Sequence, residues 1–312
     1  MKLGFFNLIT MENIKVSIPS FTHFSIGTSP YYAHQHALAI DIYQNLSLEN
    51  YEVFSPVSGK VLKTKKLLAP KARFKGGIDN DYITLIQNSD NPDLVFKILH
   101  VKLNLQAGEQ IEIGDTIGTT IRNGYFAYWS SPHLHLEIRK IDDPIRARGA
   151  VAFPLNLGNS KQQNQQILNN TEKIFLQIIS IFPEFILARL TQNFYHNIGK
   201  IYGVRGFIDK YNCILDGGIP HYKHGVIITE NMSNITSNSP IFLMGHKLGY
   251  VQEFHDNFGI FNFERINLSL NNKKIRGISL YLANTIPMIK IIPYDINGFL
   301  INPKSSYYLT IN

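Results

Sequence analysis

The strongest constraint on the fold is a succession of short β-type runs, each bounded by turn residues, between about Ile14 and Leu157. Runs such as YEVFSPVSGKVLKTK, DYITLIQN and DLVFKILHVKL are rich in β-branched and apolar residues, and Gly, Ser, Pro and Asn separate them. None of them follows the 3.6-residue period of an amphipathic helix. The sequence therefore predicts a mainly β, antiparallel domain over residues 1–157.

The second half of the chain predicts another domain. Residues 158–170 are rich in Asn, Gln and Ser, which indicates a linker. An apolar stretch at 171–192, broken near Pro183, indicates a short helical lead-in. The rest returns to short strands punctuated by Gly, Asn and Pro, so we expect a second β-rich domain at 171–312, without an assigned role.

Composition excludes several classes of protein. The single cysteine, Cys213, rules out an intramolecular disulfide framework. The net charge of +7 comes from basic residues that are mostly scattered along the chain. The stretch richest in Lys and Arg, residues 60–75, is interpreted as a solvated loop, with contact to an anionic surface as the alternative. No nucleic-acid motif accompanies this stretch. No signal peptide, membrane anchor or spanning segment is recognisable, which leaves the compartment open: cytoplasmic by default, or exported by an unrecognised route.

The run SSPHLHLEIR, Ser130 to Arg139, carries the clearest chemical signal. On a strand, His133 and His135 share one face while the intervening leucines occupy the other. Such a pair could hold a metal, or one imidazole could hold it while the other transfers protons. Asp41 in LAIDIY is flanked by apolar residues, and a buried carboxylate requires a cation beside it.

Five pieces in order resemble the LytM/lysostaphin-type zinc metallopeptidases over about residues 31–155: His36 with Asp41, SPVSGKV, His100 in LHVKL, AGEQIEIGDTIG, and HLHLE. The resemblance implies a LytM-like antiparallel sandwich or groove. It also implies a Zn²⁺ ion held by His36, Asp41 and His135, with His100 and His133 as the catalytic proton-transfer pair. Tyr31 or Tyr32 would support the oxyanion.

The first motif departs from the family pattern in its spacing. His36 and Asp41 are five residues apart, and an odd separation on a regular strand sends two side chains to opposite faces. A β-bulge, or a turn just after His36, would restore convergence. His36 is preferred because it is nearest to the usual place in the motif, and His34, seven residues from Asp41 and so also at an odd separation, is the reserve ligand.

Three functions compete. The first is a zinc endopeptidase that acts on a peptide or peptidoglycan-like substrate by metal-activated water. The second is a non-catalytic LytM-like scaffold or activator that binds a partner or cell-wall polymer. The third, a lipoyl-type or phosphohistidine carrier domain, would need one exposed Lys or His at a hairpin tip and leaves the five matching positions unexplained. The histidines at 221, 224, 246 and 255 are interpreted as surface or turn residues.

Overall fold

The computed structural model describes residues 4–11, 13–158, 173–230, 233, 235–255, 257–297, 299 and 306–311. Strands dominate this part of the chain, which confirms the mainly β fold. The chain forms two compact units, one of residues 1–24 and 38–156 and the other of residues 25–37 and 157–312. Apart from residue 158, the linker expected at 158–170 lies outside the described residues. No described helix is long and apolar enough to span a membrane.

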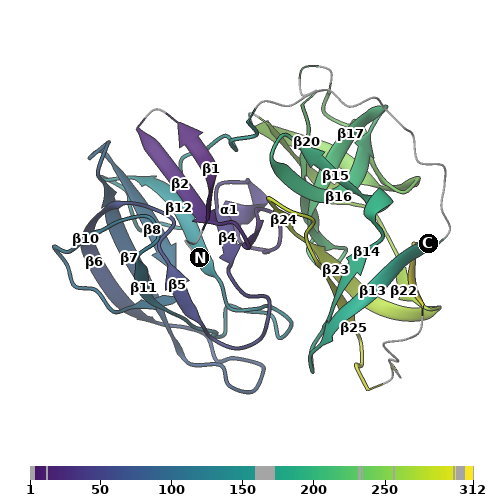
Figure 1. Ribbon diagram of the computed structural model, residues 1–312, viewed down its shortest axis with the longest axis horizontal. Coiled ribbons are helices and arrows are strands. Elements are labelled where there is room, and N and C mark those ends of the chain that lie inside the picture. Colours follow the sequence, from purple (N-terminus) through teal and green to yellow (C-terminus); the bar gives the residue numbers. More distant parts are fainter. Residues whose placement is uncertain are drawn as a thin grey trace. The chain divides into compact units, whose positions relative to one another are not determined.

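The first unit is built from short antiparallel strands (Figure 1). Its strands are β1 (Phe5–Met11), β2 (Ile14–Pro19), β4 (Ile40–Tyr43), β5 (Glu52–Phe54), β6 (Gly59–Leu68), β7 (Asn80–Asn88), β8 (Leu94–Leu99), β9 (Val101–Leu103), β10 (Gln110–Ile111), β11 (Thr116–Thr120) and β12 (Leu134–Lys140). The strand β3 (His23–Ser25) and the one-turn helix α1 (Tyr32–Gln35) precede β4 in the chain.

The main sheet of this unit has the order β10-β6-β7-β8-β12-β4, with every neighbouring pair antiparallel. A second sheet has the order β5-β11-β9, and β1 pairs with β2. The strand β12 lies between β8 and β4, and its first six residues are buried. Side chains of β12 therefore stand in the interior on both faces of the sheet.

The basic stretch at 60–75 is mostly a strand. Residues up to Leu68 belong to β6, which pairs with β7 from Gly59 opposite Asn88 to Leu68 opposite Asn80. The interpretation of the whole stretch as a loop is therefore wrong; only the residues after Leu68 leave the strand. Ala69 still donates its N–H to the carbonyl oxygen of Asp79, and Pro70 comes next, where the lost N–H donor ends regular pairing.

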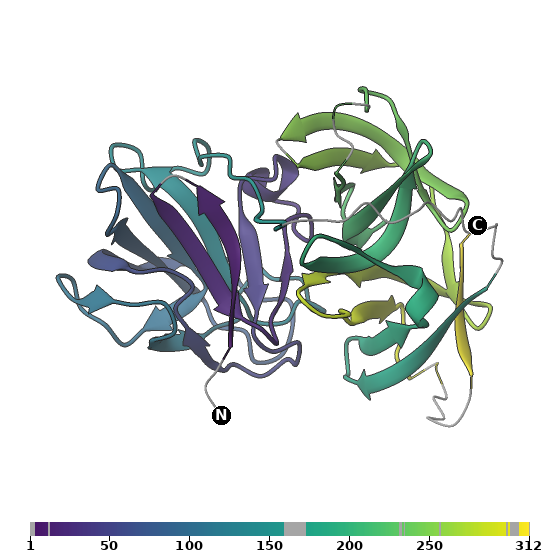
Figure 2. The ribbon, with the colours of Figure 1, turned by 45° about the horizontal axis from the view of Figure 1, so that its top comes forward.

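Most strands of the second unit, drawn in green to yellow in Figures 1 and 2, close into two rings of hydrogen-bonded neighbours. Its strands are β13 (Ile174–Ile181), β14 (Ile186–Leu190), β15 (Tyr195–Ile198), β16 (Ile201–Ile208), β17 (Tyr211–Ile219), β18 (His224–Ile228), β19 (Pro240–Leu243), β20 (His246–His255), β21 (Phe258–Phe263), β22 (Leu268–Leu270), β23 (Lys273–Leu280), β24 (Leu282–Ala283), β25 (Ile289–Pro293) and β26 (Tyr307–Ile311).

One ring runs β16-β17-β18-β21-β20-β19 and returns to β16. The other runs β13-β14-β25-β23-β22-β26 and returns to β13. The two rings are joined where β17 of the first pairs with β23 of the second. Closure removes exposed strand edges, and apolar side chains such as Ile227, Leu248 and Ile291 fill the core.

The helical lead-in expected at 171–192 is wrong. The described residues of this stretch form the hairpin β13–β14, with Pro183 in the turn between them. Burial along β13 alternates at its start, with Ile174 and Leu176 inside and Phe175 and Gln177 outside. Large apolar residues on both faces conceal this two-residue period in the sequence, and the β-branched isoleucines favour the strand.

Candidate metal centre

The centre lies on β12 and on the strands beside it. The apolar side chains of Leu134, Leu136 and Ile138 alternate with those of His135, Glu137 and Arg139, and all of them are buried. In the ladder, His135 lies opposite Asp41 of β4 on one side and opposite Leu99 of β8 on the other. Because residues directly opposite each other have neighbouring side chains, this register brings His135 to Asp41.

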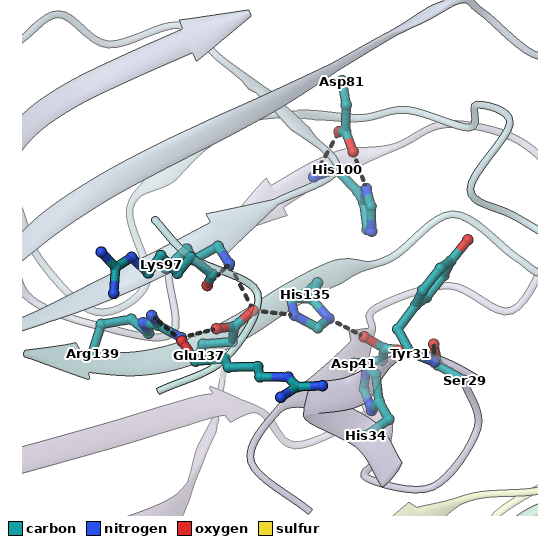
Figure 3. Close-up of polar contacts among 12 residues, drawn as sticks. Ser29, Tyr31, His34, Asp41, Asp81, Lys97, His100, His135, Glu137 and Arg139 are labelled. Carbon is teal, nitrogen blue, oxygen red and sulfur yellow. Dashed lines mark hydrogen bonds and ion pairs between the residues drawn. The ribbon is translucent and has the colours of Figure 1, made fainter. Parts of the chain in front are cut away.

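Three buried side chains could hold a metal ion: His34, Asp41 and His135 (Figure 3). One ligand atom from each lies within 4.8 Å of the other two. His34 is in α1, and Ala37, with a φ of 51°, is a left-handed residue between this helical turn and β4. The short helical turn and this left-handed residue set the direction in which the chain enters β4.

The structure places His36 elsewhere. Its Nδ1 lies 3.1 Å from Glu253 Oε2, and its ring packs against Tyr32 at a centroid distance of 4.3 Å. His36 is the C-cap of a helical turn, so the two-residue alternation of β4 does not extend back to it. A turn does follow His36, which is one of the two ways in which His36 and Asp41 were expected to converge. The trio nevertheless contains the reserve ligand His34 in place of His36. Tyr31, at the N-cap of α1, is 49% exposed.

The backbone orients the ring of His34. Its Nδ1 lies 2.7 Å from the carbonyl oxygen of Ile26, so the Nδ1–H donates there. The lone pair is then on Nε2, the atom left for a metal. A fixed tautomer with one ring nitrogen on a carbonyl is the usual arrangement of a metal-binding histidine.

His135 lies between two carboxylates. Its Nδ1 is 2.9 Å from Asp41 Oδ1, and its Nε2 is 3.2 Å from Glu137 Oε1. Burial lowers the pKa of His135, but the hydrogen bonds and charges of Asp41 and Glu137 outweigh it and raise the pKa to about 9. A neutral imidazole can donate to only one of the two carboxylates, so the arrangement requires a cation, either a proton or a metal.

The donor set fits zinc. Two imidazoles and one carboxylate are ligands that zinc prefers. With Nε2 bonded to Glu137, the Nδ1 of His135 is the atom that faces the other two ligands.

Glu137 supports His135 from behind and was not predicted as a site residue. It accepts from Lys97 Nζ at 2.9 Å and from Arg139 at 3.2 Å as well as from His135 (Figure 3). Burial raises its pKa, but His135 and Lys97 outweigh this and lower it to about 2. The alternation of β12 was the available signal, because Glu137 is two residues beyond His135 on the same face.

His133 and His100 stand beside the trio. The Nδ1–H of His133 donates to Ser131 O at 2.9 Å, and its Nε2 lies 3.4 Å from Asp41 Oδ2. Burial lowers its pKa to about 4, so the ring is neutral near pH 7. The ring of His100 lies 5.4 Å from that of His133 and 5.9 Å from that of His135, measured between centroids.

Asp81 holds His100 and was also missed by the sequence analysis. Its Oδ2 lies 2.8 Å from His100 Nδ1, and its Oδ1 accepts from the backbone N–H of His100 at 3.2 Å. Burial raises the pKa of Asp81, but the charge of His100 and their hydrogen bond outweigh it and the net shift is downward. His100 itself has a φ of 66°, a strained conformation for a residue with a side chain.

Fold and site together define a mainly β protein of two units with a buried His–Asp–His group that could hold a metal ion. Both halves of the chain match models of a single family. Residues 13–155 match its N-terminal domain and residues 190–301 its C-terminal domain, each described as a domain of unknown function (DUF8155). No curated protein matches the chain.

Some solved structures are similar at low identity. The peptidase lysostaphin from Staphylococcus simulans is 16% identical over 76% of this chain and 92% of its own, with a TM-score of 0.27. The SpoIIQ–SpoIIIAH pore-forming complex is 20% identical over 47% of this chain and 69% of its own, with a TM-score of 0.26. TM-scores this low define no common arrangement of the whole chain, so no residue role is taken from these structures.

Proposed function

We propose that this protein is a zinc-dependent endopeptidase whose metal is held by His34, Asp41 and His135. The observation that carries the proposal is the convergence of two imidazoles and a carboxylate on one buried point, with two further imidazoles beside it. A zinc ion bound there would polarise a scissile carbonyl and lower the pKa of a water molecule to about 7.

The other two imidazoles would transfer protons. With Nδ1–H donating to Ser131, His133 presents the Nε2 lone pair, which can accept a proton from water. Asp81 Oδ2 lies 2.8 Å from Nδ1 of His100 and would form an ion pair with that ring whenever it carries a proton, so that the Nε2 of His100 could donate to the departing amine. Tyr31 or Tyr32 would support the oxyanion.

The substrate class rests on the order of the five motif pieces between His36 and Glu137, which resembles enzymes that cut peptides of the cell wall. We therefore propose a peptide or peptidoglycan-like substrate. Nucleic acid and membrane anchoring have no part in the proposal.

Metal analysis of the purified, zinc-loaded chain tests the proposal. We expect about one zinc ion per chain and cleavage of isolated peptidoglycan or of a peptide library, followed by mass spectrometry. His34→Ala should lose zinc, whereas His36→Ala, the matched control two residues away, should keep it. An unaltered chain that takes up no zinc after loading contradicts the proposal.

One observation favours a non-catalytic alternative. His34 and Asp41 are each 1% exposed and His135 is 6% exposed, whereas a catalytic zinc keeps a position open to water and substrate. The chain would then be a scaffold or activator that binds a partner or cell-wall polymer, with a structural metal. Stoichiometric zinc without cleavage of any peptide supports this alternative; cleavage that is lost in His133→Ala, with zinc retained, supports the enzyme.

A further inference from the structure

Asp216 is a buried carboxylate on β17, far from the trio in sequence. It is 1% exposed and accepts three hydrogen bonds from the segment that precedes α1. Ser25 Oγ donates to Oδ1 at 2.7 Å, and the backbone N–H groups of Ile26 and Gly27 donate to Oδ2 at 2.6 and 2.9 Å. Ser25 Oγ in turn accepts from the N–H of Thr28 at 3.0 Å. One carboxylate thus fixes the start of the segment.

The same segment orients His34. The carbonyl oxygen that accepts from His34 Nδ1 belongs to Ile26. It forms one peptide unit with the N–H of Gly27, which donates to Asp216. Because a peptide unit is planar and rigid, holding its N–H also sets the direction of its C=O. Asp216 and His34 therefore bond to the N–H and the C=O of the same peptide unit.

Close packing keeps the Ile26–Gly27 peptide unit in place. A Cβ added at Gly27 would stand 3.2 Å from the Asp216 carbonyl oxygen and 3.3 Å from Val226, so the backbone lies tightly against β17 and β18. The charged acceptor also polarises the peptide and strengthens its carbonyl as an acceptor for the imidazole. The arrangement resembles a carboxylate–histidine pair with a peptide unit inserted between the two groups.

We propose that Asp216 is a positioning residue for the metal centre, acting through the Ile26–Gly27 peptide to hold His34 Nε2 toward Asp41 and His135. The inference rests on the proposed metal site. It assigns a role in metal binding to a residue of the C-terminal half, for which sequence analysis found none. Loss of the carboxylate would let the peptide rotate and release the ring of His34.

The test compares metal binding by full-length variants. Asp216→Asn removes the charge and puts an amide where two N–H groups and a hydroxyl now donate. We expect its affinity for Zn²⁺, from competition with a chelating dye, to fall by about 10-fold to 100-fold. Asp209→Asn is the matched control, because Asp209 accepts from Ser239 and has no bond to the segment at 25–28; its affinity should be unchanged.

A spectroscopic readout separates positioning from a general loss of stability. Co²⁺ in place of zinc gives an absorption spectrum that depends on the number and geometry of its ligands. The spectrum of Asp216→Asn should shift toward that of His34→Ala, while Asp209→Asn keeps the spectrum of the unaltered chain. Thermal unfolding of each variant identifies a temperature at which all of them are folded. If Asp216→Asn does not fold, Asp216→Glu takes its place, and its spectrum should likewise shift toward that of His34→Ala.

The outcomes distinguish the two proposals. If the unaltered chain binds neither Zn²⁺ nor Co²⁺, the metal centre itself is wrong and this inference goes with it. If the unaltered chain binds metal and Asp216→Asn keeps the same affinity and spectrum, the metal centre stands and the role of Asp216 is overturned.

Discussion

Two buried histidines, one in each unit, have opposite surroundings. In the first unit, His135 lies between Asp41 and Glu137, and its pKa is raised to about 9. In the second, burial lowers the pKa of His221 to about 3, and the cations Lys290 and Arg276 push it in the same direction. His224, interpreted from the sequence as a surface or turn residue, is instead a buried strand residue whose pKa is lowered to about 4, mainly by burial.

The comparison shows what distinguishes a cation site from a structural histidine. Burial disfavours the charged imidazole in both units, because the interior solvates charge poorly. Only a carboxylate at hydrogen-bonding distance reverses this and makes the position favourable for a cation. The number of histidines in a segment is therefore a weaker signal than the acidic residues that the fold places beside them.

The largest expected effect is at His135. His135→Ala should reduce bound zinc from about one ion per chain to none, because it removes a ligand and the group that separates two buried carboxylates. Elemental analysis after zinc loading and dialysis measures this. His221→Ala is the control in the second unit and should bind zinc like the unaltered chain; equal losses in both variants would erase the contrast between the units.

The next largest effect is on the rate of peptide cleavage, with metal binding unchanged. Asp81→Asn should lower the rate of peptide cleavage by about 10²-fold to 10⁴-fold, because the neutral amide replaces the carboxylate that lies 2.8 Å from Nδ1 of His100 and holds that ring. Bound zinc should remain at the level of the unaltered chain, since neither residue is in the trio. Rates and zinc content measured on one preparation check this; unchanged cleavage would remove His100 from the proposed chemistry.

A smaller effect is expected at Glu137. Glu137→Gln should lower zinc affinity by about 10-fold to 100-fold, because Glu137 sets the tautomer of His135. It should also destabilise the first unit by about 3–5 kcal/mol, since Lys97 and Arg139 lose a buried counter-charge. Competition titration and urea unfolding measure the two effects. Full affinity in a folded variant would show that the orientation of His135 does not depend on this carboxylate.

The smallest effect is the pH dependence of the second unit. The pKa of His196 is lowered to about 4, by burial and by Arg205, and that of His221 to about 3, both below the 6.5 of an ordinary histidine. Between pH 6.5 and about 4 the unfolded chain therefore binds more protons than the folded chain, so stability is full above pH 6.5 and falls as the pH falls.

The expected loss is at most about 1.4 kcal/mol per pH unit for each histidine, reduced where solvent reaches the ring. Urea unfolding of the full chain between pH 7.5 and 4.5 measures it, with tyrosine fluorescence or amide exchange to follow the second unit. The variant His221→Gln should show a shallower slope. A slope that His221→Gln leaves unchanged would mean that another group titrates.

The sequence predicted the strand content of the first unit and placed the metal centre near β12 because those signals are local. Alternation along LHLEIRK puts His135 and Glu137 on one face whatever lies around the strand. The lead-in at 171–192 was misjudged for a related reason. Its strands carry large apolar residues on both faces, and such runs have no period that separates helix from strand.

Local alternation along a strand could not identify the third ligand. Counting residues back from Asp41 assumes a strand, whereas the chain makes a helical turn at 32–35 and is left-handed at Ala37, so His34 rather than His36 joins the trio. Asp81 and Asp216 matter only through contacts made across strands or across nearly 200 residues of chain.

By itself, the sequence determined that the chain is mainly β and that the imidazoles of His133 and His135 lie two residues apart where β12 begins, since both are local signals. Only the tertiary structure decided which carboxylates meet those imidazoles and which histidine completes the group. The physical reason is that the affinity of a buried site for a cation depends on charges within a few ångströms, and distance in space is set by strand register and chain reversals rather than by separation along the chain.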